Sequence, residues 1–348
     1  MNNSFNKTDY LSLPQTAALK GILAICVLLC HTIPASKVFY GNILSPLIGS
    51  LGYLSVSVFF FLSGYGIMTQ YSIKKEKYLH SFLKRRVLSI YLLTVFLIAI
   101  YWIFHCLLGQ NDPLYFIVSS FLIGDTIVSN GWYLQVIVLF YLIWYLCVYF
   151  IRIPKLRSVA LGGAIILYMF AAALLFSGST WYECSLSFIL GMLFQQNRER
   201  IEQTFFKTKH RYIRWLILVA CLFAGFYVAV HITYPVNVSI NGIIRIGFKC
   251  LSSPLFCMLV ILVLAVLNLE QCRILRYLGK ISIEIYVLQG IPLALFRWKS
   301  LCIEKGWLYN IVVIASTIIL AVAMHPLIHF IMKIPQKLWR NEHVRSIQ

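Results

Sequence analysis

The sequence predicts an all-α polytopic membrane protein with about ten transmembrane helices and with both termini in the cytoplasm. Of its 348 residues, 60% are hydrophobic and only 12% are charged, and the mean hydropathy is +0.82. A soluble domain is typically about half apolar and about one quarter charged. Long apolar runs recur along the whole chain, and cations alternate between the loops that join them. We therefore expect residues 1–348 to form a single transmembrane domain.

The apolar runs set the number of expected spans. A spanning helix needs about 20 mostly apolar residues, and ten runs approach or exceed that length, the sixth being short. The segment 112–130 is also apolar, but Asp112, Pro113, Gly124 and Asp125 interrupt it, which favours a re-entrant or interfacial stretch. The expected spans are 15–33, 46–70, 87–108, 131–151, 159–177, 181–196, 213–232, 242–267, 280–297 and 307–332.

The distribution of cations sets the expected orientation. A formal net charge of +19 would ordinarily suggest a nucleic-acid partner. Here the cations occupy five separate segments of one parity, the last being a basic tail from about residue 333. Loops of the other parity hold few cations, except the last, which contains Arg297, Lys299 and Lys305. The positive-inside bias therefore places both termini in the cytoplasm, and no nucleic acid is required.

Ten cysteines form neither a CxxC motif nor a Cys/His cluster. Most lie inside apolar runs, where cysteine behaves as a small hydrophobic residue. We therefore expect no metal site and no disulfide scaffold.

The first span contains two polar residues, Lys20 and His31, whose burial in a membrane is costly unless they are paired or solvated. Eleven helical steps of about 100° bring both side chains to one face, about 16 Å apart along the axis. The expected orientation places Lys20 towards the cytoplasm and His31 near the outer side. Each also has an ordinary explanation, because Lys20 can extend to the headgroups and His31 can cap the helix end.

Spans two and nine carry further small or polar residues. Ser63, Gly64 and Gly66 permit close helix approach in span two, with packing as the ordinary role of Gly66. Ser282, Tyr286 and Gln289 form a polar stripe on one face of span nine. Lys280 and Glu284 stand four residues apart and can pair with each other.

Six motifs in sequence order resemble the membrane-integral acyltransferase family 3, whose members O-acylate cell-envelope carbohydrates in bacteria and related targets elsewhere. The first is a cation followed eleven residues later by His, here Lys20 and His31. The others are Phe59-Phe60-Phe61-Leu62-Ser63-Gly64-Tyr65, the basic entry to span three at 82–91, Trp132-Tyr133-Leu134, Phe188-Ile189-Leu190-Gly191-Met192, and the stripe Gly279, Ser282, Tyr286 and Leu288.

The resemblance implies an acyl-CoA donor, usually acetyl-CoA, that approaches from the cytoplasm, with no tightly bound cofactor. Its phosphates would meet Lys20, Lys84, Arg85 and Arg86. His31 would be catalytic, either as a general base on a sugar hydroxyl or as the nucleophile that first takes the acyl group. Glu183, and after it Asp125, would be the carboxylate that orients His31. Residues expected to line the acceptor pocket are Ser63, Trp132, Tyr133, Ser282 and Tyr286.

The same resemblance implies a carbohydrate or lipid-linked glycan acceptor, such as a cell-surface polysaccharide, and a multi-pass protein among the lipids of the cell (inner) membrane. Three positions depart from the family pattern. Lys20 stands where Arg is frequent, Ser89 replaces a second cation of the basic segment, and Gln289 replaces a His that could titrate.

Two other functions fit the sequence. One is a carrier or flippase for lipid-linked sugars or polysaccharide export, in which Lys20 and His31 line a transport path. The other is a related sensing module without turnover.

Overall fold

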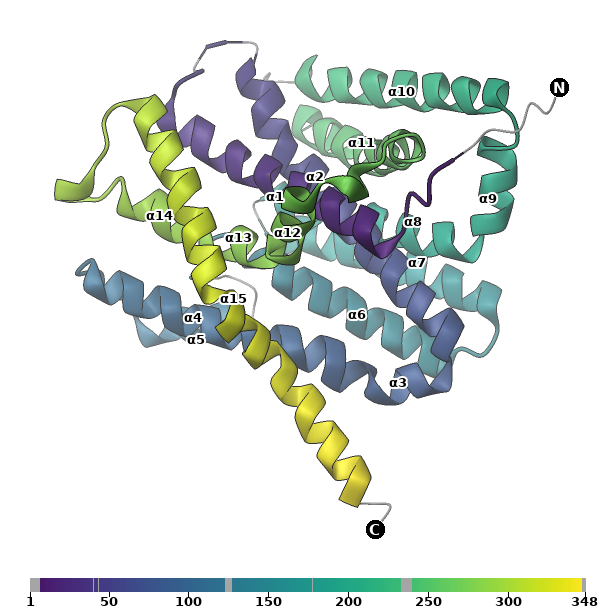
Figure 1. The fold of residues 1–348 in the computed structure, drawn as a ribbon, viewed down its shortest axis with the longest axis horizontal. Helices are drawn as coiled ribbons and strands as arrows, with labels where there is room; N and C mark the ends of the chain where they lie inside the picture. Colours follow the sequence, from purple (N-terminus) through teal and green to yellow (C-terminus); the bar gives the residue numbers. More distant parts are fainter. Residues whose placement is uncertain are drawn as a thin grey trace. The chain divides into compact units, whose positions relative to one another are not determined.

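The computed structural model describes residues 7–39, 41–42, 44–122, 127–176, 178–232 and 240–345. The structure is 84% helical, and no strand occurs among these residues. The all-α prediction is therefore confirmed. Short helical turns connect several of the longer helices. Figure 1 colours the helices by their order along the chain, from purple at the N-terminus to yellow at the C-terminus.

The α-helices are α1 (Leu13–Ser36), α2 (Leu44–Lys74), α3 (Glu76–Phe82), α4 (Leu88–Leu107), α5 (Leu114–Leu122), α6 (Trp132–Phe150), α7 (Pro154–Leu175), α8 (Ser185–Gln196), α9 (Arg198–Phe205), α10 (Lys209–Ile232), α11 (Ile240–Leu264), α12 (Arg273–Lys280), α13 (Ser282–Leu288), α14 (Gly290–Leu295) and α15 (Gly306–Arg345). A π-helical turn, η1 (Leu83–Val87), joins α3 to α4, and the 3-10 turns are η2 (Ser179–Trp181), η3 (Leu269–Gln271) and η4 (Lys299–Leu301).

Within the described residues, eight helices are long and apolar enough to cross a membrane. They correspond to the expected spans one to five, seven, eight and ten, so the polytopic architecture is confirmed. The sixth expected span is the 12-residue helix α8, which is too short to cross alone. The ninth is a broken pair, α12 and Ser282–Leu295, bent by 57°, and it raises the count to nine if the pair forms one span. The orientation of the termini stays a prediction.

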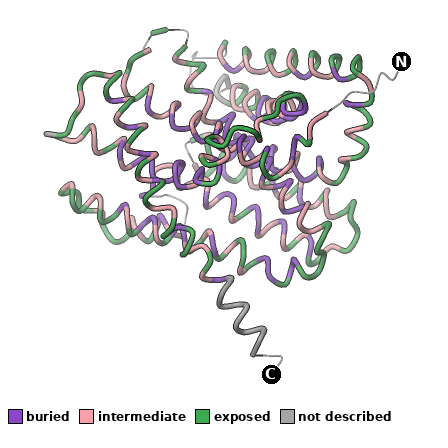
Figure 2. Tube along the Cα trace, viewed as in Figure 1, coloured by how far each residue is buried: buried purple, intermediate pink, exposed green. Residues whose placement is uncertain are grey.

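The outward surfaces of several helices are apolar. On α7, the Leu174 and Leu175 side chains are 87% and 77% exposed. Exposed residues also run along much of α10, as Figure 2 shows. A surface of this kind is unfavourable in water and is the surface that a lipid bilayer accepts. Together with the eight spans, it identifies a membrane protein.

The chain divides into two compact units, and the single-domain organisation stays a prediction. The first unit comprises Met1–Cys26, Ser50–Ile73 and Pro154–Lys280. Helices α10 and α11 lie side by side within it (Figure 1). The second unit comprises Val27–Gly49, Lys74–Ile153 and Ile281–Gln348. In it, α15 packs on α4 and α13, and a buried aromatic group joins α3 to α6, with the Phe82 and Trp144 rings 4.7 Å apart.

Glycines allow two helices of the first unit to touch. A Cβ on Gly64 of α2 would lie 2.2 Å from the carbonyl oxygen of Phe188 on α8. A Cβ on Gly191 of α8 would lie 2.1 Å from the carbonyl oxygen of Phe61. The small-residue prediction therefore holds for Gly64, but it was wrong for Gly66, which faces open space.

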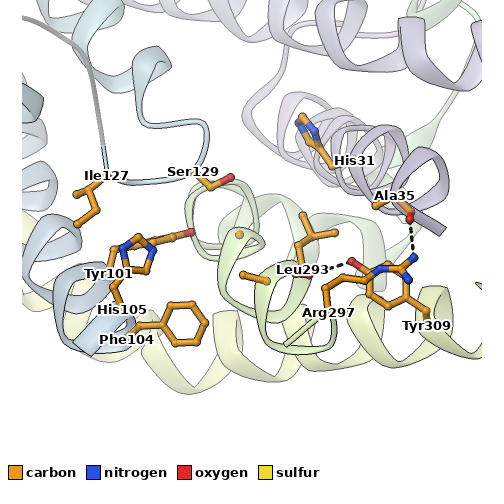
Figure 3. Close-up of a pocket in the computed structure, with 12 residues that line it drawn as sticks. His31, Ala35, Tyr101, Phe104, His105, Ile127, Ser129, Leu293, Arg297 and Tyr309 are labelled. Carbon is orange, nitrogen blue, oxygen red and sulfur yellow. Dashed lines mark hydrogen bonds between the residues drawn. The ribbon is translucent and has the colours of Figure 1, made fainter. Parts of the chain in front are cut away.

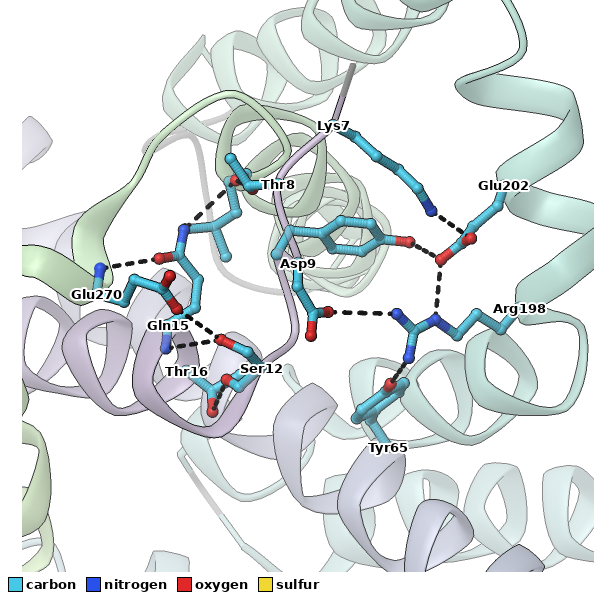
Figure 4. Close-up of polar contacts among 12 residues, drawn as sticks. Lys7, Thr8, Asp9, Ser12, Gln15, Thr16, Tyr65, Arg198, Glu202 and Glu270 are labelled. Atoms are coloured by element: carbon cyan, nitrogen blue, oxygen red, sulfur yellow. Dashed lines mark hydrogen bonds and ion pairs between the residues drawn. The ribbon is translucent and has the colours of Figure 1, made fainter. Parts of the chain in front are cut away.

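A network of charged groups holds the start of the chain against α9 in the first unit (Figure 4). The guanidinium of Arg198 donates 2.9 Å hydrogen bonds to Glu202 and to the Tyr65 hydroxyl, and it lies 3.6 Å from Asp9. Glu202 also pairs with Lys7 and accepts a 2.8 Å hydrogen bond from Tyr10. Burial alone would raise the pKa of Glu202, but hydrogen bonds from Lys7, Arg198 and Tyr10 lower it to about 2.

Candidate functional site

The second unit contains a cavity of about 410 Å³. Its walls come from α1, α4, α14 and α15 and from the segment before α6, as Figure 3 shows in part. The volume lies within the range of small-molecule sites. The lining residues are His31, Ala35, Tyr101, Phe104, His105, Ile127, Ser129, Gly290, Leu293, Ala294, Arg297 and Tyr309.

His31 lies on the part of α1 that belongs to the second unit, and its side chain is half-buried at the cavity wall. Helix α1 is continuous from Leu13 to Ser36, so Lys20 and His31 are carried by one helix, as the sequence predicts. Among the described residues, none forms a hydrogen bond or an ion pair with the His31 ring. Both ring nitrogens therefore remain available to a ligand in the cavity.

A second histidine, His105, lines the same cavity from the last turn of α4. Its Nδ1 lies 2.7 Å from a carboxylate oxygen of Asp112, in the segment before α5. The two side chains are 22% and 16% exposed. A histidine held in this way by a carboxylate has a fixed ring orientation.

Arg297 contributes the cation of the cavity wall. Its guanidinium lies over the Tyr309 ring, 4.1 Å from the ring centroid, and donates a hydrogen bond to the Ala35 carbonyl. The Tyr309 hydroxyl donates a 3.0 Å hydrogen bond to the Leu293 carbonyl. Stacking and hydrogen bonding therefore fix the guanidinium plane.

Gly290 brings α14 against the opposite wall. A Cβ at this position would lie 2.6 Å from the Tyr101 hydroxyl, which donates a 2.8 Å hydrogen bond to the Val287 carbonyl. The wall formed by Tyr101, Ser129 and Gly290 therefore has no space for a larger side chain at position 290.

Four of the sequence-predicted acceptor residues lie in the second unit, outside the lining of this cavity. The rings of Tyr133 and Tyr286 pack with centroids 5.3 Å apart, and Trp132 packs edge-on against Tyr133. Ser282 and Tyr286 are buried on α13. The structure therefore brings Tyr133 and Tyr286 together. Among the predicted site residues that the structure describes, His31 alone lines the cavity.

The basic segment with Lys84, Arg85 and Arg86 is helical rather than a loop. It forms the π-helical turn η1, closed by a hydrogen bond from the Leu88 N–H to the Leu83 carbonyl. Lysine and arginine are good helix formers, and single π-turns frequently mark functional sites. Ser89, which replaces the second cation, is buried and donates a 3.4 Å hydrogen bond to the Lys84 carbonyl.

Lys20, Ser63 and Glu183 belong to the first unit. The side chains of Lys20 and Ser63 are half-buried. Glu183 is buried, and its carboxylate lies 2.9 Å from Lys249 Nζ and accepts a 2.6 Å hydrogen bond from Ser179. This carboxylate therefore has two strong partners within its own unit. Asp125 lies outside the described residues.

Two polar residues of span nine, Glu284 and Gln289, have partners that the sequence did not indicate. Glu284 pairs with His325 of α15, with 2.6 Å between the Oε1 and Nδ1 atoms. Gln289 is fully buried and donates a 2.9 Å hydrogen bond to the Tyr286 carbonyl.

Sequence reasoning did not single out the charged and titratable groups at the cavity other than His31, namely the lining residues Arg297 and His105 and the His105 partner Asp112. Arg297 stood out only as an exception to the charge bias of the loops, and Asp112 only as an interruption of an apolar segment. His105 sits at the end of an apolar run, where nothing in the local pattern distinguishes it. The clearest available signal was the ionisable pair, seven residues apart, where an apolar helix ends.

Comparison with known proteins places most of the chain in one family model. The model, described as an acyltransferase domain of acyltransferase family 3, matches residues 17–325. The match covers α2 to α14, most of α1 and the first half of α15, including every residue that lines the cavity. No match was found among curated proteins or among solved structures.

Proposed function

Because this chain belongs to acyltransferase family 3, we propose that it transfers an acetyl group from cytoplasmic acetyl-CoA to a hydroxyl of a cell-surface glycan or of a lipid-linked glycan precursor. The observation that carries the proposal is the position of His31. Its ring lines a cavity of about 410 Å³ and has no hydrogen-bond partner among the described residues. A neutral imidazole in such a place acts either as a base or as a nucleophile.

We assign donor binding to the cations at one end of the first span and in η1. Lys20 lies eleven residues before His31 on α1, which corresponds to about 16 Å along the helix axis. An extended pantetheine arm has a length on this order, so a thioester reaches His31 while the CoA phosphates remain near Lys20. Lys84, Arg85 and Arg86 are the further phosphate ligands in the proposal.

His31 has two chemical routes in the proposal. As a general base, it takes the proton of the acceptor hydroxyl while the oxygen attacks the thioester carbon and CoA leaves as the thiolate. As a nucleophile, its ring nitrogen displaces CoA first, and the hydroxyl then attacks the acyl-imidazole. Both routes end with an ester on the acceptor and the free thiol of CoA, because His31 passes a proton to the thiolate and regains one from the acceptor hydroxyl in the complete cycle.

The residues proposed to contact the acceptor are those predicted from the sequence. Ser63, Trp132, Tyr133, Ser282 and Tyr286 are proposed to contact the glycan, since aromatic faces and hydroxyls suit sugar rings. Glu183 is the proposed orienting carboxylate of His31, and it also contacts Lys249 and Ser179. The proposed location is the cell (inner) membrane, and the positive-inside bias supports an orientation with both termini in the cytoplasm.

The proposal is tested by measuring CoA release from acetyl-CoA by the purified protein in detergent. The acceptor is surface polysaccharide from the source cells, stripped of its esters with mild alkali. We expect thiol release that depends on the polysaccharide and appears as labelled ester on it. Movement of a lipid-linked sugar across proteoliposomes without CoA release would instead identify a carrier, and neither activity would fit a sensing module.

A further inference from the structure

The cavity that holds His31 contains a second imidazole to which the proposed function gives no role. His105 lines the wall from α4, whereas His31 approaches from α1 (Figure 3). One imidazole alone has to serve both the thioester and the acceptor hydroxyl. Two imidazoles in one cavity allow these tasks to be divided.

The contact with Asp112 favours one tautomer of the neutral His105 ring. An ionised carboxylate only accepts hydrogen bonds, so at 2.7 Å the Nδ1 atom of neutral His105 carries the proton. The Nε2 atom then has a free lone pair that accepts a proton. A carboxylate behind a histidine in this way is the arrangement that catalytic triads use to fix ring and tautomer.

The pair is not needed to close the turn in which it lies. Backbone hydrogen bonds already do so, from the Gln110 N–H to the His105 carbonyl and from the Gly109 N–H to the Cys106 carbonyl, each 2.9 Å long. Gly109 adopts a φ of 73°, which a glycine accepts at no cost. An ionisable pair at the end of an apolar helix is costly without a function.

We propose that His105 is the general base that deprotonates the acceptor hydroxyl and that Asp112 is its positioning residue; the inference rests on the proposed function. The hydroxyl oxygen forms the new bond to the acyl carbon, and its proton passes to Nε2 of His105. The bond from the acyl carbon to the His31 nitrogen breaks, and that nitrogen takes the proton from His105. His31 is thus assigned the nucleophilic route. In the preceding step its ring nitrogen bonds to the acyl carbon while the C–S bond breaks, and the CoA thiolate takes the proton that the acylated imidazole ring gives up.

The test compares two acceptors with labelled acetyl-CoA as donor. The first is the de-esterified polysaccharide, whose hydroxyls need a base. The second is hydroxylamine, which is nucleophilic at neutral pH without one. For His105→Gln, we expect kcat with the polysaccharide to fall by at least about 100-fold. Because only the second half-reaction is slowed, the kcat/KM for acetyl-CoA and the rate with hydroxylamine should stay at the wild-type values.

The variants Asp112→Asn and Asp112→Glu distinguish a role of Asp112 in positioning His105 from a role in folding. We expect Asp112→Asn to lower kcat with the polysaccharide while leaving its KM unchanged, and Asp112→Glu to restore part of the rate. The matched control is His325→Gln, which changes another carboxylate-bound histidine of the same unit that does not line the cavity. Its activity should equal that of the wild type with both acceptors.

Two results would overturn the inference. If His105→Gln transfers acetyl to the polysaccharide at the wild-type rate, His105 is not the base. If the variant loses acetyl transfer to the polysaccharide and to hydroxylamine equally, His105 supports the fold or the donor site. A wild-type protein that transfers to neither acceptor would refute the proposed function itself, and the inference would fall with it.

Discussion

Gly290 stands so close to Ser129 that a Cβ at position 290 would lie 2.3 Å from the Ser129 Cβ atom. The two residues form one wall of the cavity that holds His31 and His105. Real Cβ atoms do not approach so closely, and the atom met here is fixed to the backbone rather than at the end of a flexible side chain. The cavity geometry therefore depends on the absence of a side chain at position 290.

Gly290→Ala is expected to displace this wall and to lower acyl transfer. Overpacking of this kind costs about 1–3 kcal/mol, and the shift of Ser129 and Tyr101 should reduce kcat by about tenfold or more. The control is Gly163→Ala on α7, where an added Cβ meets nothing within 4 Å. Equal activities of the two variants would show that the wall is not part of the site.

Lys20→Ala is expected to weaken donor binding rather than chemistry. Loss of a charge-assisted contact to a CoA phosphate corresponds to a rise of about tenfold in the KM for acetyl-CoA. Lys20→Arg should retain the wild-type KM, because the charge is preserved. An unchanged KM for Lys20→Ala, measured where donor binding limits the rate, would remove Lys20 from the donor site.

The Glu202 network predicts a specific dependence of stability on pH. The pKa of Glu202 is lowered from its ordinary value of 4.5 to about 2 in the folded protein. Its ionisation therefore stabilises the fold fully above pH 4.5, and this contribution is lost as the pH falls towards 2. The melting temperature of Glu202→Gln in detergent should lie below that of the wild type near neutral pH, and the gap should close on acidification. A gap that stays constant down to acidic pH would argue against the network.

The Glu284–His325 pair is expected to matter for stability. Glu284 is 3% exposed, and removal of its only ion-pair partner among the described residues leaves a carboxyl that must stay charged without a partner or take up a proton. His325→Ala should lower the free energy of unfolding by up to about 3 kcal/mol. His325→Gln retains an N–H donor and should lose less. Thermal unfolding in detergent distinguishes the two, and equal melting temperatures would contradict this role.

Much of the fold follows from the one-dimensional pattern of the sequence. Apolar length determines whether a helix can span a membrane, so the continuous helix that carries Lys20 and His31 was predicted correctly. The sixth and ninth spans differ because hydropathy does not show where a helix breaks. The 12-residue α8 starts after the turn at 179–184, and a bend of 57° follows Lys280.

The site was less predictable, because its residues meet only through the tertiary structure. His31 could be predicted as a site residue because its spacing from Lys20 places both side chains on one face of the same helix. His105, Asp112 and Arg297 come from other elements, and their proximity depends on how α1, α4 and α14 pack. The spacing of Glu284 and Lys280 allows the two to pair within one helix, whereas the structure pairs Glu284 with His325 of α15. Sequence spacing predicts contacts within a helix, but not contacts between helices.

The role of His31 is tested most directly by the initial rate at which purified protein transfers labelled acetyl from acetyl-CoA to the de-esterified polysaccharide. His31→Ala should reduce this rate by at least about 100-fold. Its yield, monodispersity and melting temperature in detergent should match those of the wild type. A His31→Ala protein that acetylates the polysaccharide at the wild-type rate would contradict the account.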